Sequence, residues 1–314
     1  MSYIDRPLKI ASLFFCLGFS IWACSSEGGP KQSETASEIG IRRRTSPQRI
    51  ICAAPSITEF VFALGFGHRV VGVSDFSTFP PEAKGKPQVG GLINPNKEKI
   101  VSLEPDLLIL QGRNDSLARL CKESGIRFLS IEIDSLEDIW SAVALIGEEL
   151  KAPDKASALV LRIQEELRSV RERIPPLPPV RVFLSLGHTH GDLTGLMTAS
   201  SRTFIHELLT LAGGDNIFKD ASGLYPQISK ESLVKRRPEV IMETIPGGAG
   251  DKKQKMLIRD WLQLPMLPAV RSGRIHFLTE DYLLIPGVRI AHIVLRFAQI
   301  IHPDVFNESG DARA

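Results

Sequence analysis

The sequence predicts an α/β protein made of two similar lobes that one long helix joins. Three observations support this prediction: a helical stretch near the middle of the chain, a phrase that occurs once on either side of it, and an alternation of short apolar runs with amphipathic segments. With 314 residues, of which 43% are apolar, the chain is long enough to bury the core of two such lobes.

The joining helix is predicted over residues 153–174. Apolar residues recur there at spacings of three and four, which places them on one face of a helix. They are Val160, Ile163, Leu167, Val170 and Ile174. Pro153 suits a first helical turn, and the prolines that begin at Pro175 end the helix. At 1.5 Å per residue the helix is about 30 Å long, which makes it a rigid strut.

The repeated phrase occupies residues 98–109 and 231–242. Each copy opens with a glutamate, passes through a proline followed by an acid, and ends in an apolar run. The two glutamates, Glu98 and Glu231, are 133 positions apart. We interpret each copy as a short helix, a turn and a buried strand, and therefore expect two lobes of similar structure.

The first lobe is expected over residues 48–152. Its predicted strands are residues 49–53, 70–73, 107–110 and 127–131, and its predicted helices are residues 57–64, a short helix from Glu98, 116–124 and 134–150. Residues 74–95 form a long Pro/Gly-rich stretch that contains Phe76 and Phe79, and we expect it to lie at the rim of a site.

The second lobe is expected over residues 175–306. A strand at residues 180–186 runs into a loop at residues 187–192 that contains His188 and His190. Further elements are expected at residues 204–211, 229–236, 240–242, 252–263, 275–278 and 288–301. This alternation predicts parallel sheets flanked by helices, that is, two Rossmann-like lobes with a cleft between them. Ligands of open α/β sheets lie at the carboxyl ends of the strands.

The two ends of the chain are expected to lie outside the fold. Residues 1–23 combine a basic start with an apolar run of about 14 residues, too short for a membrane span of about 20. They resemble a bacterial lipoprotein signal with Cys24 as the lipidated residue; an uncleaved anchor and an ordinary secretory signal are the alternatives. Residues 24–47 are expected to be a flexible tether, and residues 307–314 a disordered tail.

Composition excludes several classes of function. The formal charge of +2 and the absence of a Lys/Arg run longer than three residues argue against nucleic-acid binding. The chain has no Gly-x-Ser-x-Gly, no phosphate-binding loop and no His-Glu-x-x-His motif, so we expect no enzyme. A secreted metal-binding enzyme or storage protein on a similar scaffold is the alternative.

Cys52 and Cys121 are the two cysteines of the predicted first lobe. They are either buried free thiols or a disulfide.

Residues 49–303 resemble the class III periplasmic substrate-binding proteins of ABC importers that bind cobalamin, haem or siderophores, and are most similar to the cobalamin binders. The matching pieces are residues 55–59, 71–73, 80–83, 89–91, 98–109, 213–218 and 225–231. The resemblance implies two lobes on one rigid helix, an exported monomer in the periplasm or at the cell surface, and no intrinsic cofactor. The implied partners are a permease dimer, its cytoplasmic ATPase and a small metal chelate.

In that family, the first glutamate of each repeated phrase meets arginines of the permease. Carried over by motif, these residues are Glu98 and Glu231. The alternative is that each simply stabilises the first turn of a helix, where a carboxylate gains about 0.3 to 1 kcal/mol from the helix dipole.

A corrinoid of the cobalamin type is the first expected ligand, and haem and a ferric siderophore are the alternatives. The residues expected to bind it are Pro55, Ser56, Phe76, Phe79, Gly91, Gln111, Arg113, His188, His190, Tyr225 and Tyr282. The aromatic residues could equally be packing residues, and Arg113 could be solvated. His188 and His190 could ligate a metal or haem iron, or could only cap backbone groups.

Overall fold

The structure is a computed structural model that describes residues 45–245, 247–248 and 250–307. The predicted signal, Cys24, nearly all of the predicted tether and most of the predicted tail lie outside these residues. Residues from Ser46 onward belong to one compact unit. None of the described helices is both long and apolar enough to cross a membrane.

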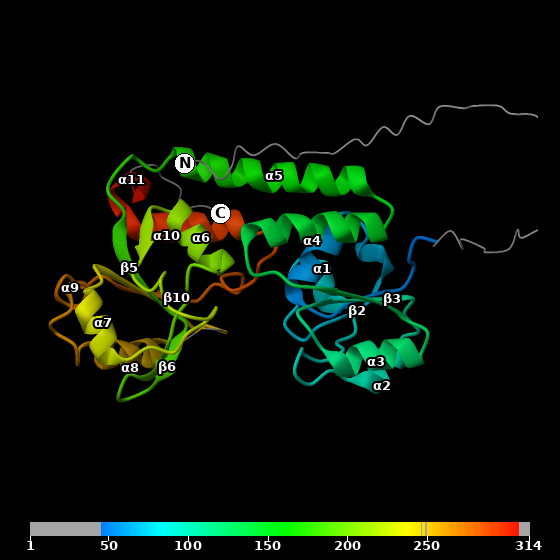
Figure 1. Ribbon diagram of the computed structural model, residues 1–314, viewed down its shortest axis with the longest axis horizontal. Coiled ribbons are helices and arrows are strands. Elements are labelled where there is room, and N and C mark those ends of the chain that lie inside the picture. Colours follow the sequence, from blue (N-terminus) through cyan, green and yellow to red (C-terminus); the bar gives the residue numbers. More distant parts are fainter. Residues whose placement is uncertain (1–44, 246, 249, 308–314) are drawn as a thin grey trace, which may run out of the picture. The chain divides into compact units, whose positions relative to one another are not determined.

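The first lobe contains a parallel sheet in the order β2-β1-β3-β4 (Figure 1). Its strands are β1 (Ile50–Cys52), β2 (Val70–Val73), β3 (Leu107–Gln111) and β4 (Arg127–Ile131). Its helices are α1 (Pro55–Ala63), η1 (Gly67–Arg69), η2 (Pro81–Gly85), α2 (Lys97–Ser102), α3 (Asp115–Glu123) and α4 (Leu136–Glu149). Helices α1 and α4 pack on one face of the sheet, and α2 and α3 on the other.

The second lobe contains a parallel sheet in the order β10-β9-β5-β8, and beside it a separate hairpin. Its strands are β5 (Val180–Ser185), β6 (Gly187–Thr189), β7 (Thr194–Met197), β8 (Gly214–Asn216), β9 (Val240–Thr244) and β10 (Ile275–Leu278). Its helices are α6 (Phe204–Leu211), α7 (Lys230–Arg236), α8 (Asp251–Trp261), α9 (Pro268–Arg271), α10 (Ile290–Ile301) and α11 (Pro303–Asn307). Helices α6 and α10 pack on one face, and α7, α8 and α9 on the other.

The repeated phrase folds in the same way in both lobes. Strands β3 and β9 begin 133 positions apart, as do helices α2 and α7. In each lobe the residue before the proline has a left-handed backbone: Glu104 (φ 45°), two residues after α2, and Arg237 (φ 46°), directly after α7. The acid that follows the proline accepts a backbone N–H from the neighbouring strand: Asp106 from Arg49 at 3.1 Å, and Glu239 from Arg181 at 3.0 Å. The predicted fold class is therefore confirmed.

Helix α5 (Pro153–Glu172) runs beside α4 in the first lobe and α10 in the second, and its inner face belongs to a core that both lobes share (Figure 1). The approach to α4 is close, because a Cβ at Gly147 would lie 2.4 Å from that of Ala156. The buried stripe consists of Ala156, Leu159, Ile163, Leu167 and Val170. Val160, which we expected in this stripe, is only half-buried.

One local expectation differs from the structure, and one open alternative is decided by it. Residues 187–192 were expected to form a loop, but Gly187–Thr189 is strand β6 and pairs with β7 in an antiparallel hairpin. The sequence gives no strand signal here, because residues 187–192 contain only glycine, histidine, threonine and aspartate and show no alternation of apolar and polar residues. Cys52 and Cys121 are free and buried on opposite faces of the first sheet, so they do not form a disulfide.

Candidate functional site

The carboxyl ends of β1 and β3 bring together two of the residues expected to bind ligand. Pro55 begins α1, and the buried hydroxyl of Ser56 donates a hydrogen bond to the Gln111 side-chain oxygen at 2.5 Å. The arginine that follows β3 points elsewhere: Arg113 Nε contacts Asp115 Oδ1 at 2.9 Å, in an ion pair exposed to solvent. Asp115 raises the pKa of Arg113 through this contact. Arg113 is thus a surface residue with an acidic partner in its own loop.

Exposed apolar side chains gather on the loop between β2 and α2. Phe76 is 73% exposed and Ile93 is 95% exposed, with Leu92 partly exposed between Ile93 and Gly91. A side chain at Gly91 would contact the Phe76 ring at 3.9 Å, so Phe76 lies over this glycine. A hydrogen bond within the loop stabilises it, because the Asp75 carboxylate accepts the Gly90 N–H at 3.0 Å. Sequence reasoning missed Leu92 and Ile93, although two apolar residues in a Pro/Gly-rich stretch were the available signal.

The second lobe presents Tyr225, which is 41% exposed, and the exposed Met197, which forms an isolated β-bridge with Gln227, two residues after Tyr225. Burial raises the pKa of Tyr225, and the Asp134 carboxylate of the first lobe raises it further. Its phenol stays protonated at neutral pH.

Phe79 and Tyr282 lie together, but at the contact between the lobes. The Arg289 guanidinium lies 4.4 Å from the Phe79 ring centroid and 5.2 Å from that of Tyr282. Arg289 also donates to Glu59 Oε1 from Nε at 3.0 Å and from Nη2 at 2.7 Å, joining the second lobe to helix α1. Phe79 and Tyr282 therefore pack on a buried interlobe ion pair.

Further contacts surround this ion pair. The Val288 N–H donates to Glu59 Oε2 at 3.0 Å, and a Cβ added at Gly287 would lie 2.2 Å from the same oxygen, so a side chain there would displace the Glu59 carboxylate. Thr78 of the first lobe donates to Asp281 of the second at 2.8 Å. These contacts fix the lobes to each other beside the joining helix.

A cavity of about 650 Å³ lies beside this interlobe contact. Its lining comes from α1, η1, η2 and the residues near them, with Arg162 of α5 and Val288 of the second lobe. Of the residues expected to bind ligand, only Phe79 lines it. We therefore place the candidate ligand surface at the strand ends, on Phe76, Ile93 and Tyr225, and not in this cavity.

The two docking candidates occupy matching places. Glu98 and Glu231 are exposed, and each is the second residue of its helix. The helices are capped alike: Asn96 accepts the Lys99 N–H at 2.9 Å, and Ser229 accepts the Ser232 N–H at 3.2 Å. Backbone and Ser229 hydrogen bonds lower the pKa of Glu231. Helices α2 and α7 both lie on the side of the sheets away from α5 (Figure 1).

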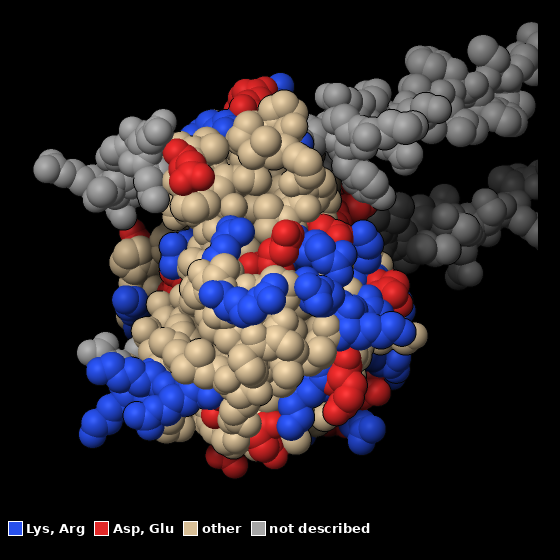
Figure 2. Space-filling view, turned by 90° about the vertical axis from the view of Figure 1, so that its left-hand side faces the viewer, with Lys and Arg blue, Asp and Glu red and all other residues tan. Residues whose placement is uncertain are grey.

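Figure 2 shows the side of the molecule that carries the second lobe. Basic and acidic side chains are interspersed with uncharged surface there, apart from one basic cluster at the lower left. This mixed surface agrees with the small formal charge of the chain.

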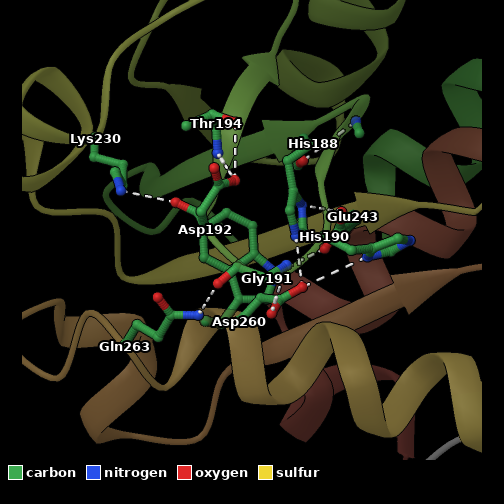
Figure 3. A network of polar contacts seen from close by, with 12 residues as sticks. His188, His190, Gly191, Asp192, Thr194, Lys230, Glu243, Asp260 and Gln263 are labelled. Atoms are coloured by element: carbon green, nitrogen blue, oxygen red, sulfur yellow. Dashed lines mark hydrogen bonds and ion pairs between the residues drawn. The ribbon is translucent and has the colours of Figure 1, made fainter.

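His188 and His190 lie within the second lobe, in a network with two carboxylates (Figure 3). The His188 side chain is fully buried, with Nδ1 2.8 Å from Glu243 Oε1 and Nε2 3.2 Å from Asp260 Oδ2. Burial alone would lower the pKa of His188, but the two carboxylates outweigh it and raise this pKa. His188 therefore offers no atom to a ligand at the strand ends. Sequence reasoning missed Glu243 and Asp260, which are far from it in the chain.

Comparison with known proteins agrees with this arrangement. The model of the periplasmic binding protein family matches residues 50–282. The chain is 29% identical to a protein of Bacillus subtilis named an uncharacterized ABC transporter substrate-binding lipoprotein, over 89% of this chain and 88% of the relative. It is 30% identical to the vitamin B12-binding protein of Pectobacterium atrosepticum, over 66% of this chain and 74% of the relative.

A solved structure shares the fold as well. A periplasmic heme-binding protein from Pseudomonas aeruginosa is 28% identical, with a TM-score of 0.72 over 82% of this chain and 93% of that one. Together with the family match, this similarity also implies that the protein is exported and carries a small molecule for a permease and an ATPase. The chain belongs to the periplasmic binding protein family and is an ABC transporter substrate-binding protein.

Proposed function

We propose that this protein captures a corrinoid of the cobalamin type between the strand-end loops of its two lobes and delivers it to an ABC importer. The observation that carries the proposal is the pair of exposed surfaces formed by Phe76 and Ile93 on one lobe and Tyr225 on the other. Apolar and aromatic side chains at the ends of parallel strands suit the flat face of a large ring. Its cobalamin-binding relative supports the same class of ligand.

Haem is the second candidate, because Tyr225 could ligate iron and a haem-binding protein shares the fold. A tyrosine that ligates haem iron does so as the phenolate. Burial and the Asp134 carboxylate raise the pKa of Tyr225, so the ligand-free protein carries the neutral phenol there. A neutral phenol is suited to stacking on a corrinoid and to hydrogen bonding with it.

A ferric siderophore is the third candidate ligand, and the charges near the site favour the corrinoid over it. Anionic chelates and haem propionates need free cations near the site. Arg289 forms ion pairs with Glu59 and Asp281, and Arg113 forms an ion pair with Asp115. Both arginines thus already have acidic partners.

We further propose that the protein is a monomer without catalytic activity, held at a membrane through lipidated Cys24. Its relatives are solute-binding proteins, and one is named a lipoprotein. Mass spectrometry of the mature N-terminal peptide tests the anchor: diacylglycerol on Cys24 is expected, and an unmodified N-terminus would contradict it. Unchanged cobalamin recovered after incubation is expected from a protein without catalytic activity.

The ligand is tested by titrating the purified protein with cobalamin, cobinamide, haem and ferric siderophores, followed by intrinsic fluorescence and by ligand absorbance. A corrinoid site predicts that Tyr225→Phe binds cobalamin nearly as well as the wild type, while Tyr225→Ala and Phe76→Ala each lose about tenfold, or about 1.4 kcal/mol. Leu161→Ala, which removes an exposed apolar side chain of α5, is the matched control.

The alternatives give different results in the same experiment. If haem binds and Tyr225→Phe abolishes its iron-coordination spectrum, the ligand is haem. Binding of ferric siderophores alone would select the third candidate. If none of these compounds binds, the proposed class of ligand is wrong.

A further inference from the structure

We propose that the second lobe contains a binding site for one divalent first-row transition metal ion, with Zn²⁺ as its probe. The ligands are His188 Nε2, His190 Nδ1 and Asp260 Oδ2, contributed by β6, by the turn after it and by the last turn of α8 (Figure 3). This site is separate from the surface proposed for the transported ligand, so the two proposals stand or fall independently.

The spacing of the three atoms fits a small cation. Asp260 Oδ2 lies 3.2 Å from His188 Nε2 and 3.5 Å from His190 Nδ1, and all three groups offer ligand atoms within 4.8 Å of one another. Ligands that hold zinc tetrahedrally at about 2.1 Å are separated from each other by roughly 3.4 Å. Two of the three separations therefore already match, and the third is no longer than 4.8 Å.

The groups behind the ligands are arranged as metal sites require. A metal-binding histidine usually has a carboxylate at its other ring nitrogen, and Glu243 Oε1 lies 2.8 Å from His188 Nδ1, as an ion-pair contact and not as an aligned hydrogen bond. Glu243 is itself held by the Trp261 indole N–H at 2.6 Å. The second oxygen of Asp260 accepts the Gly191 N–H at 3.2 Å, which fixes this carboxylate against the ligand-bearing turn. His188 Nε2 is thus left facing the proposed ion.

The charge of the two buried carboxylates also favours a bound cation. Glu243 and Asp260 are 2% and 6% exposed, and within the described residues their ion-pair partners are histidines, without a lysine or arginine. Asp260 also lies in the last turn of α8, where the helix dipole disfavours a negative charge. The two carboxylates carry two negative charges in a largely buried place. A divalent cation neutralises both.

The site has a route to solvent and a structural consequence. The His190 side chain is 42% exposed, so an ion can enter from its side and keep an open coordination position there. Bound metal would join the β6–β7 hairpin to α8. Since Met197 of β7 bridges to Gln227, this hairpin also supports the segment that carries Tyr225.

The test is calorimetric titration of the EDTA-treated, dialysed protein with Zn²⁺, without any transported ligand. One ion per chain is expected, together with a higher midpoint of thermal unfolding. His190→Ala and Asp260→Asn remove a ligand and should weaken binding by about 100-fold or more, and Glu243→Gln, behind the ligand, by about tenfold. His68→Ala, an exposed histidine of the first lobe, should bind Zn²⁺ as the wild type does.

Co²⁺ gives a second readout that does not depend on stability. Bound to the wild type, it should show the intense visible absorption of a four-coordinate ion, and His190→Ala should lose it. Because the His190 side chain is half-exposed, this variant should keep the wild-type circular dichroism spectrum. No saturable binding of Zn²⁺ to the wild type, or equal binding by wild type and His190→Ala, would overturn the proposal and leave His188 as a buried bridge between two carboxylates.

Discussion

The two lobes have the same sheet topology but place different chemistry at the end of the corresponding strand. Strand β1 leads directly into α1, whereas the matching strand β5 is followed by the β6–β7 hairpin before α6 begins. The first lobe buries Ser56 there, with one hydrogen bond to Gln111. The second lobe buries His188 between Glu243 and Asp260. A repeated scaffold thus sets where a site can form, and an insertion decides which chemistry it has.

A smaller difference lies within the sheets themselves. Ile109 of β3 pairs with Leu129 of β4, and the matching Met242 of β9 pairs with His276 of β10. The first lobe therefore has an apolar side chain where the second has one that titrates.

The largest expected effect tests whether the two lobes act together on the permease. In Glu98→Ala/Glu231→Ala, cobalamin affinity in solution should stay nearly unchanged, and uptake into cells that carry the permease should be abolished, because both oriented charges are lost. Each single variant should retain part of the uptake. The matched control is Glu123→Ala/Glu172→Ala, which removes two other exposed acids. Normal uptake by a well-expressed double variant would leave both glutamates as helix-start residues.

The next effect concerns the contact that joins the lobes. Arg289→Met leaves the buried Glu59 without its cation, so the free energy of unfolding should fall by about 3–5 kcal/mol. Chemical denaturation measures this change. Arg162→Met breaks the exposed pair with Glu166 on α5 and should cost about 0.5 kcal/mol or less. If the two variants lost equal stability, the interlobe ion pair would not hold the lobes.

A third prediction tests the repeat at its two left-handed helix ends. Glu104→Gly and Arg237→Gly should each relieve backbone strain and raise the free energy of unfolding by up to about 1 kcal/mol, equally in both lobes. Gly125→Ala, at φ 69° with open space around it, should cost a similar amount and serves as the reverse control. A gain in one lobe and a loss in the other would show that the two ends are not equivalent.

The smallest effect depends on pH. Burial, with Arg274 and Arg296 nearby, lowers the pKa of His276 below its ordinary value near 6.5. The unfolded chain then binds more protons than the folded one, so the contribution of His276 is fully present above about pH 6.5 and is lost as pH falls below it. His276→Leu, which installs the residue of the first lobe, should therefore gain stability relative to the wild type between pH 7 and pH 5. A difference that does not change with pH would contradict this reasoning.

The sequence by itself determined the elements and the scaffold. Periodicity predicted α5 to within two residues at its end, and the spacing of 133 between Glu98 and Glu231 predicted two lobes of one topology. These properties are local: helical spacing, caps and turn residues depend on neighbours in the chain, so they can be read from it. The motifs also led to the family, which the comparison confirmed.

Only the tertiary structure decided which distant residues meet. Phe79 and Tyr282 were expected to bind ligand, yet both pack on Arg289, which is paired with Glu59, 230 positions away in the chain. His188 was visible in the sequence, but its partners Glu243 and Asp260 come from β9 and α8, and no local pattern marks them. Contacts of this kind depend on the register of a sheet and the packing of helices on it, and a pattern of single residues does not encode them.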